Sequence, residues 1–484
     1  MKRLYSFLVG ALLLTGTPLL AQTTHEPWQA GVDTLSTVIK KDPKSAEELV
    51  KTYMKGNKKN TRLLYEVGQA YLDADSLATE TAPNIVIANE YVAKIQKIKR
   101  EDPLSYLLDG DIKLHLNKAG EAATAYEQAT YFDPNNKEAA VKKALILRKA
   151  NPDECIKQLL AIHQQDPSYA YVNRQLLNLY YKEKKDYKAA APFFESIIKS
   201  EDSRESDFTS YAFSLLSSDP AKAKSVAEAG LQKYPSSISC KRLLMYADIA
   251  SNSPSAAASV EKYFSTTKPE DQLYYDFIFR AMFNSNNGKY AEAAADYEQA
   301  FNKDKKQTNC LSKASDAYEK AGDFGKAIDT YKTYLDDLKA ANKTLTFDDV
   351  FKAGRLHYSR ASQSETPADV KAADLKAAGD AFDEAAKLDP NNASSYFWHG
   401  RVGAALDPET KTFVAKPYYT KALELLKAEN NPEKNKSELI ECLSYLGYAA
   451  FQSKDIASCK DYFKQVLTLD PTNKGATDAL SNLK

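Results

Sequence analysis

One stretch near the C-terminal end, residues 443–471, constrains the fold more than any other part of the sequence. Apolar residues recur in it at the 3.6-residue spacing of a helix, first over 443–451 and again over 456–467. Polar residues 453–455 separate the two runs, and Pro471 follows the second. The pattern predicts two helices joined by a tight turn, because the helical period appears twice with a breaker between the runs and a proline after them.

The same hairpin pattern recurs upstream with its spacing unchanged. Each copy begins at a position that we call the first column. A small residue follows twelve positions later, a bulky one after four more and another apolar one after three more. Most copies end with a proline. The columns are Gly447, Cys459, Phe463, Val466 and Pro471; Gly110, Ala122, Tyr126, Ala129 and Pro134; Lys143, Cys155, Leu159, Ile162 and Pro167; Tyr211, Ala223, Ala227, Gly230 and Pro235; and, without the proline, Ala281, Ala293, Tyr297 and Ala300, and Ser315, Ala327, Tyr331 and Tyr334.

This repeated unit resembles the tetratricopeptide repeat, a helix-turn-helix of about 34 residues with small and large residues in these columns. The resemblance covers most of the chain after residue 60. It implies an all-α fold, an α-solenoid that winds as a right-handed superhelix of about ten helix-turn-helix repeats, because one hairpin cannot bury its apolar face alone. The small residues would let two helices approach closely, with a ring filling the space beside them, and proline would end the second helix.

On this basis the chain divides into four parts. They are a signal peptide at 1–21, N-terminal helices and a linker at 22–60, the repeat array at 61–474 and a C-terminal capping helix at 475–484.

Three places in the array depart from the regular spacing. Residues 73–84 are predicted to be an insertion, and residues 362–369 to hold most of the extra length of the hairpin that ends at Pro390. Residues 407–414 are predicted to form an extended turn. The segment 236–269 matches the repeat pattern least well.

Residues 1–21 have the pattern of a secretory signal. Lys2 and Arg3 precede an apolar run over 4–14, which is too short to span a bilayer comfortably, and Ala21 offers a small residue for cleavage. The alternative is an uncleaved anchor. The residue immediately after Ala21 is not a cysteine, so the acylated cysteine of bacterial lipoproteins is missing. We therefore expect cleavage near Ala21, a mature chain without a transmembrane segment, and a periplasmic or outer-membrane-associated location in a Gram-negative bacterium.

Composition excludes several function classes. Lys plus Arg equals Asp plus Glu, 65 each, so the chain lacks the basic excess of a nucleic-acid-binding protein. The five cysteines show no CxxC spacing. Two of them fall in the small-residue column of second helices and the other three near the start of first helices, where a small residue also packs, so we predict small buried hydrophobes rather than disulfides or zinc ligands. The five histidines are scattered, and no metalloprotease, P-loop, dinucleotide-binding or nucleophile-elbow motif is present. We expect no catalytic residue, no metal and no cofactor, and therefore a non-enzymatic protein.

The resemblance also implies a binding surface. The first helix of each hairpin would line the inner, concave side, and its exposed residues would lie three before and one after the first column. These positions are Tyr65 and Gln69, Leu107 and Asp111, Gln175 and Leu179, Ile278 and Met282, Ser312 and Asp316, Phe351 and Arg355, Phe397 and Arg401, and Ser444 and Tyr448. Repeats that hold the acidic C-termini of chaperones carry Lys and Asn at such a pair, and no pair here does.

Two successive hairpins present the same pair of residue types, Phe351 with Arg355 and Phe397 with Arg401. Two guanidiniums beside two rings could hold a carboxylate or an extended acidic-aromatic peptide. The alternative is that each arginine pairs with a nearby acidic residue of the chain, such as those at 348–349.

Three functions are compatible with these features. The first is an exported scaffold that binds a protein or peptide on the concave face of the superhelix. The second is a subunit of an envelope complex for secretion or outer-membrane biogenesis. The third is a carrier of glycans or small molecules, for which Trp28 and Trp398 are too few and too far apart. We favour the first.

Overall fold

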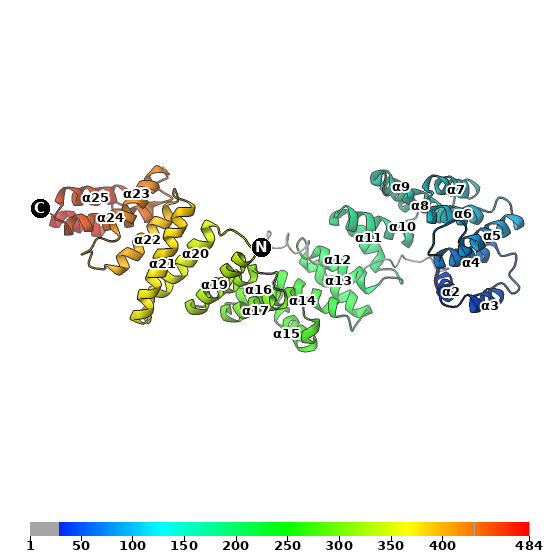
Figure 1. Ribbon diagram of the computed structural model, residues 1–484, viewed down its shortest axis with the longest axis horizontal. Coiled ribbons are helices and arrows are strands. Elements are labelled where there is room, and N and C mark those ends of the chain that lie inside the picture. The colour runs from blue at the N-terminus through cyan, green and yellow to red at the C-terminus, as the bar shows by residue number, and fades with distance from the viewer. Residues whose placement is uncertain (1–28, 430, 484) are drawn as a thin grey trace. The chain divides into compact units, whose positions relative to one another are not determined.

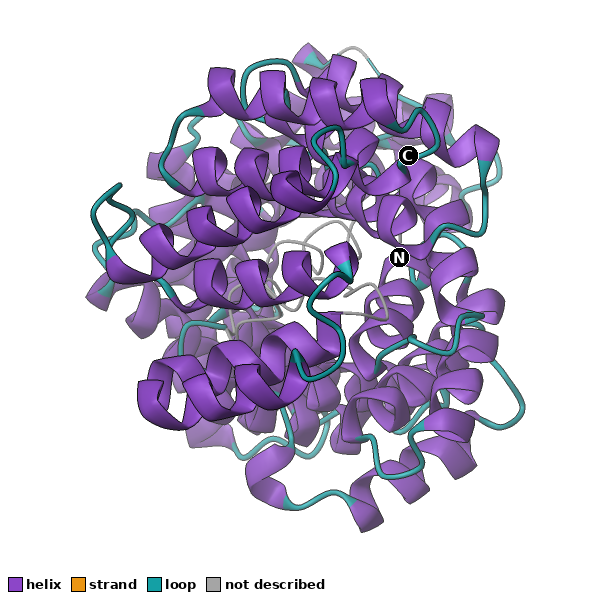
Figure 2. Ribbon diagram, turned by 90° about the vertical axis from the view of Figure 1, so that its right-hand side faces the viewer, coloured by secondary structure: helices purple, strands orange, loops and turns teal. Residues whose placement is uncertain are grey.

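The computed structural model describes residues 29–429 and 431–483, and within them the chain is helical, with turns and loops but no strand (Figure 2). The predicted signal peptide lies outside the described residues. No described helix combines the length and the apolar character needed to cross a membrane. The all-α prediction is confirmed for the part of the chain that the structure describes.

The chain folds as two compact units that meet in sequence between Ser251 and Asn252. In the first unit the helices are α2 (Gln29–Lys41), α3 (Pro43–Tyr53), α4 (Thr61–Ala74), α5 (Pro83–Ile98), α6 (Pro103–His115), α7 (Ala119–Phe132), α8 (Lys137–Ile146), α9 (Pro152–Gln165), α10 (Ala170–Leu177) with the π-helix η1 (Asn178–Glu183), α11 (Tyr187–Ile198), α12 (Glu205–Leu215), α13 (Pro220–Lys233) and α14 (Ile238–Ala250).

The second unit continues the same alternation of first and second helices (Figure 1). Its elements are α15 (Ala256–Thr266), the short 3-10 helix η2 (Pro269–Asp271), α16 (Tyr274–Asn286), α17 (Tyr290–Lys303), α18 (Asn309–Lys320), α19 (Phe324–Ala340), α20 (Phe347–Ala361), α21 (Ala368–Leu388), α22 (Ala393–Leu406), α23 (Lys416–Ala428), α24 (Lys436–Gln452), α25 (Ile456–Leu469) and α26 (Lys474–Asn482).

Within each unit, helices pack mainly on their neighbours in sequence. The two helices of a hairpin pack together, the second packs on the first helix of the next hairpin, and some first helices also touch, as α4 does with α6 and α20 with α22. Packing between sequence neighbours is typical of an α-solenoid, in which each repeat buries its apolar face against the next. The predicted solenoid class is therefore confirmed.

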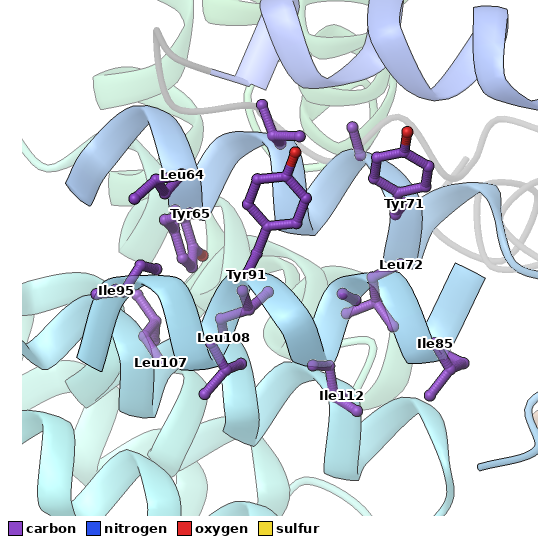
Figure 3. Close-up of a cluster of buried hydrophobic side chains, with 14 of the residues drawn as sticks. Leu64, Tyr65, Tyr71, Leu72, Ile85, Tyr91, Ile95, Leu107, Leu108 and Ile112 are labelled. Atoms are coloured by element: carbon purple, nitrogen blue, oxygen red, sulfur yellow. The ribbon is translucent and has the colours of Figure 1, made fainter. Parts of the chain in front are cut away.

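The core lies between successive helices rather than in one central cluster. Figure 3 shows its beginning in the first unit, where apolar residues of three helices interdigitate. They are Leu64, Tyr71 and Leu72 from α4, Ile85, Tyr91 and Ile95 from α5, and Leu107, Leu108 and Ile112 from α6. All five cysteines are buried and free, which confirms their prediction as small core residues.

Glycine in the first column allows a ring to lie directly against the backbone of the first helix. A Cβ atom on Gly110 would lie 2.4 Å from the Cε1 atom of Tyr126, and one on Gly400 would lie 2.9 Å from the Tyr419 ring. The same contact joins Gly354 to Phe382 and Gly447 to Phe463. These separations are too short for a side chain, so glycine and the ring are matched in these hairpins.

The structure corrects one predicted departure from the repeat. The largest share of the extra length before Pro390 lies in α21, which has 21 residues where α25 has 14, and only a smaller share lies in the loop at 362–367. The reason is local: Pro367 stands immediately before the helix, and the sequence after it is rich in Ala, Lys and Asp without a breaker. The predicted insertion at 73–84 is a loop for most of its length, between α4 and α5.

The predicted extended turn at 407–414 is present between α22 and α23. The Asp407 carboxylate accepts hydrogen bonds from the backbone N–H groups of Lys411 (2.9 Å), Thr412 (2.7 Å) and Phe413 (2.9 Å). These bonds hold the pKa of Asp407 below its usual value, although burial acts in the opposite direction.

Candidate binding surface on the first helices

The predicted inner-face residues are less accessible than expected. Asp316 and Tyr448 are exposed, and Met282, Ser312, Phe351, Arg355, Arg401, Ser444 and Asp111 are half-buried. The others are buried, and the expectation that they are exposed is wrong: Tyr65, Gln69, Leu107, Gln175, Leu179, Ile278 and Phe397.

Tyr65 shows the physical reason. Its hydroxyl donates a hydrogen bond of 2.9 Å to Glu138 on α8, and it also lies 3.3 Å from Asp111 on α6. The first helices of the following hairpins therefore cover this side chain. Spacing within one helix does not show how closely the next first helix approaches, so the burial could not be read from the repeat pattern.

A polar network joins α4, α6, α7 and α8 in the first unit. Lys142 Nζ lies 2.7 Å from Asp111 Oδ2 and 3.0 Å from Glu138 Oε1. The other oxygen of Asp111 accepts a 2.7 Å hydrogen bond from the Tyr126 hydroxyl, and the Gln69 amide donates to Oδ2.

The ion pairs of this network keep Lys142 and Glu138 in their charged forms. Burial alone would lower the pKa of Lys142, but the adjacent Asp111 and Glu138 carboxylates raise it well above its usual value. Burial likewise favours the neutral form of Glu138, yet Lys142 and Arg62 hold its pKa below the usual value. These groups satisfy one another, so they are a structural link between hairpins rather than an open ligand site.

The arginines of the second unit are also engaged. Arg401 forms a two-pronged pair with Glu441 of α24, at 2.8 Å and 2.6 Å, and its guanidinium lies 4.6 Å from the centre of the Phe397 ring and 4.8 Å from that of Trp398. Hydrogen bonding to Glu441 raises the pKa of Arg401 further.

Arg355 contacts Glu319 of α18 at 3.3 Å. Both arginines thus pair with acidic residues of the chain, which favours the alternative considered from the sequence. Their partners come from neighbouring hairpins and not from residues 348–349. Glu441 and Glu319 are residues that the sequence reasoning missed, because they lie on helices separated from the arginines by whole repeats.

A common arrangement emerges at the position after the first column. In several hairpins this residue bonds to the first helix of the next one, as Asp316 does with Lys352 at 2.5 Å and Arg401 does with Glu441. In the hairpin of α24 and α25 the residue is Tyr448, which is 44% exposed. Its hydroxyl accepts a hydrogen bond of 2.8 Å from Gln452 of the same helix.

Phe451 lies three residues beyond Tyr448, on the same side of α24, and is 48% exposed. Helix α26 follows α25 and packs on it, and Leu483 covers Ala450 and Cys459 but leaves both rings accessible. We call Tyr448 and Phe451 the terminal ring pair. Tyr448 was predicted from the repeat columns; Phe451 was not, although its spacing from Tyr448 could have indicated it.

The terminal ring pair offers apolar area and one hydroxyl, a combination common at protein interfaces. No group of His, Cys, Asp or Glu in the described residues is arranged to hold a metal ion.

Comparison with known proteins agrees with the repeat in this hairpin. Residues 440–473, which cover most of α24 and all of α25, match the family model of the tetratricopeptide repeat. No curated protein matches the chain. A repeat of this type is typical of scaffolds for protein–protein interaction.

Several solved structures are similar to the chain. One is the C-terminal part of a TPR repeat-containing protein from Cytophaga hutchinsonii, at 25% identity and a TM-score of 0.46, covering 56% of this chain and 99% of that one. Another is a tetratricopeptide repeat protein from Parabacteroides merdae, at 15% identity and a TM-score of 0.28, covering 53% and 98%. A third is the Cut9–Hcn1 hetero-tetramer of the APC/C, at 14% identity and a TM-score of 0.28, covering 93% and 90%.

Proposed function

We propose that this chain is a non-enzymatic scaffold that binds a protein partner, and that the terminal ring pair is part of the contact. The observation that carries the proposal is the exposure of Tyr448 and Phe451 in the hairpin that matches the tetratricopeptide repeat. In several other hairpins the residue at the position of Tyr448 is bonded to the next first helix, as Asp316 is to Lys352 and Arg401 is to Glu441, whereas Tyr448 and Phe451 face solvent. Large exposed rings favour association, because their burial removes apolar area from water.

The partner that suits this surface is an amphipathic helix. Two rings three residues apart along α24 form a short apolar ridge, against which the apolar face of a helix packs. The hydroxyl of Tyr448 can meet a polar group at the edge of such a contact.

Replacing both rings tests this assignment. The variant carrying Tyr448→Ser and Phe451→Ser should fold, because both side chains are exposed, and should lose the proteins that wild type captures by cross-linking in its native compartment. Tyr131→Ser is the matched control, since Tyr131 is a tyrosine of α7, outside the terminal ring pair, that is 78% exposed. Circular dichroism checks folding. An unchanged set of captured proteins in the double variant would refute a role for the ring pair.

We further propose that the chain is exported and acts in the cell envelope. The support is the sequence of residues 1–21, with two cations before an apolar run and a small residue at Ala21. Mass spectrometry of the protein from fractionated cells should find a periplasmic or outer-membrane-associated chain that begins near Gln22. Changing Lys2 and Arg3 together to Glu should leave precursor inside the cell. A wild-type chain that retains Met1 and stays in the cytoplasm would contradict export.

A further inference from the structure

A cavity of about 250 Å³ opens between α23, α24 and α25 in the second unit. It lies where the chain passes from α23 to α24, and none of the predicted inner-face residues lines it. It is therefore separate from the terminal ring pair and from the polar contacts of the first helices.

The cavity occurs at one of the longer connections between hairpins, and the connections at 54–60 and 267–273 have the same length. The connections at 133–136, 166–169, 389–392 and 470–473 each have four residues, whereas the connection from α23 to α24 runs from 429 to 435. A short connection brings the end of one helix directly against the start of the next. The longer one leaves space there, with Asn431 and Pro432 on one side of the opening.

The floor of the cavity is apolar. It is formed by Leu426 of α23, Leu439 and Leu443 of α24, and Leu469 of α25. The first three are 6%, 4% and 1% exposed, so they belong to the core and hold a fixed shape. An apolar chain that enters would replace water against these leucines, which favours binding.

The charge at the opening of the cavity is positive. Lys427 is the one charged residue among the described residues that line the cavity. Its Nζ atom donates to the neutral amide oxygen of Gln465 at 2.8 Å, while the Gln465 nitrogen donates to Asp461.

Carboxylates near the opening already have other partners. Glu424 pairs with Lys421 at 2.9 Å, and Glu429 accepts a 2.8 Å hydrogen bond from Asn435. The Lys427 ammonium is thus held beside an apolar cavity by a neutral group, and an incoming carboxylate would be a stronger partner.

We propose that this cavity binds a free amphiphile consisting of one apolar chain that ends in a carboxylate, with the chain on the leucine floor and the carboxylate at Lys427. The volume is just below that of sites for drug-sized molecules, about 300–1,000 Å³, which suits a single aliphatic chain. The proposal does not depend on the protein-binding function, because the two surfaces share no residue.

Calorimetric titration of the full chain with octanoate, and with octanol as the uncharged probe, tests the site. Octanoate should bind saturably at one site. Lys427→Gln should weaken octanoate by about three- to tenfold and leave octanol unchanged, because it removes only the charge pair. Thr468→Trp should abolish binding of both, because Thr468 is an exposed residue of the lining and a larger side chain there fills the opening.

Lys416→Gln is the matched control, since Lys416 lies on the same helix but does not line the cavity. No saturable binding of octanoate would overturn the proposal, as would equal losses in the Lys416 and Lys427 variants or full binding by the Thr468 variant. The last probe in the titration is a peptide that ends in leucine with a free carboxylate. If that peptide binds and octanoate does not, the occupant is a protein C-terminus and the proposed free amphiphile is wrong.

Discussion

At the scale of single residues, glycine and a ring act as one unit. The Tyr126 ring occupies the space where a side chain on Gly110 would be, and Phe382, Tyr419 and Phe463 do the same in other hairpins. The glycine matters because the ring is there, since glycine within a helix is otherwise less stable than alanine.

Gly110→Ala should therefore destabilise the protein, by about 1–3 kcal/mol, because the added methyl group would overlap the Tyr126 ring. Gly120→Ala is the matched control, because Gly120 lies in the first turn of α7 and nothing would contact its Cβ within 4 Å. It should raise stability slightly, by about 0.5 kcal/mol. Urea unfolding followed by circular dichroism measures both, and equal stability of the two variants would contradict the matching of Gly110 with the Tyr126 ring.

At the scale of elements, ion pairs join neighbouring helices in addition to their apolar packing. Asp374 of α21 is buried and accepts from His357 Nδ1 (2.7 Å) and from Arg360 Nε (2.6 Å) and Nη2 (2.7 Å), both on α20. Burial alone would raise the pKa of Asp374, but hydrogen bonds from Arg360 and His357 lower it below its usual value. The carboxylate thus fastens α21 to α20.

Asp374→Asn should cost about 2–3 kcal/mol of unfolding free energy at pH 7, because a charged acceptor shared by two donors is lost. The pKa of Asp374 is lower in the folded than in the unfolded chain, so its contribution is present above about pH 4 and is lost as the pH falls further. The gap between wild type and variant in urea unfolding should accordingly narrow toward pH 3.

Asp380→Asn provides the control for this prediction. Asp380 lies on the same helix and pairs with Lys376 at 2.6 Å, but both side chains are largely exposed. Its replacement should change stability by less than about 0.5 kcal/mol. A difference in unfolding free energy between wild type and Asp374→Asn that stayed constant down to pH 3 would exclude a stabilising role of the ionised Asp374 carboxylate.

At the scale of the whole molecule, stability is distributed along the chain, because helices within a unit pack mainly on their sequence neighbours. In such a fold, the effect of a local change on stability is largest in the adjoining repeats and declines with distance along the array. A single global unfolding energy then describes the protein less well than a set of local ones.

Gly400→Ala should show this locality in the second unit. Its Cβ atom would lie 2.9 Å from the Tyr419 ring, so the hairpin of α22 and α23 should loosen. Hydrogen exchange should accelerate in α22 to α25 and stay unchanged in α16 and α17. Gly325→Ala, where the nearest atom would be at an ordinary 3.7 Å, is the control and should leave exchange unchanged throughout. Uniform acceleration across the unit would contradict local coupling.

The sequence by itself determined the helices, their order and the glycines and rings that are matched between the two helices of a hairpin. The reason is that helical periodicity, breakers and steric size are local properties, and they repeat from Gly110 with Tyr126 to Gly447 with Phe463. It also indicated the extended turn at 407–414. It did not indicate that the largest share of the extra length predicted at 362–369 lies in the helix α21, because a helix can lengthen without any change of pattern.

Only the tertiary structure decided which inner-face residues are available. Gln69 and Leu179 occupy the same column position as Tyr448, one after the first column, yet the first two are buried and the third is exposed. Arg401 meets Glu441 because two helices forty residues apart in sequence lie side by side. Exposure and ion pairing depend on what the next hairpin covers, and that is a property of the assembled array rather than of any one repeat.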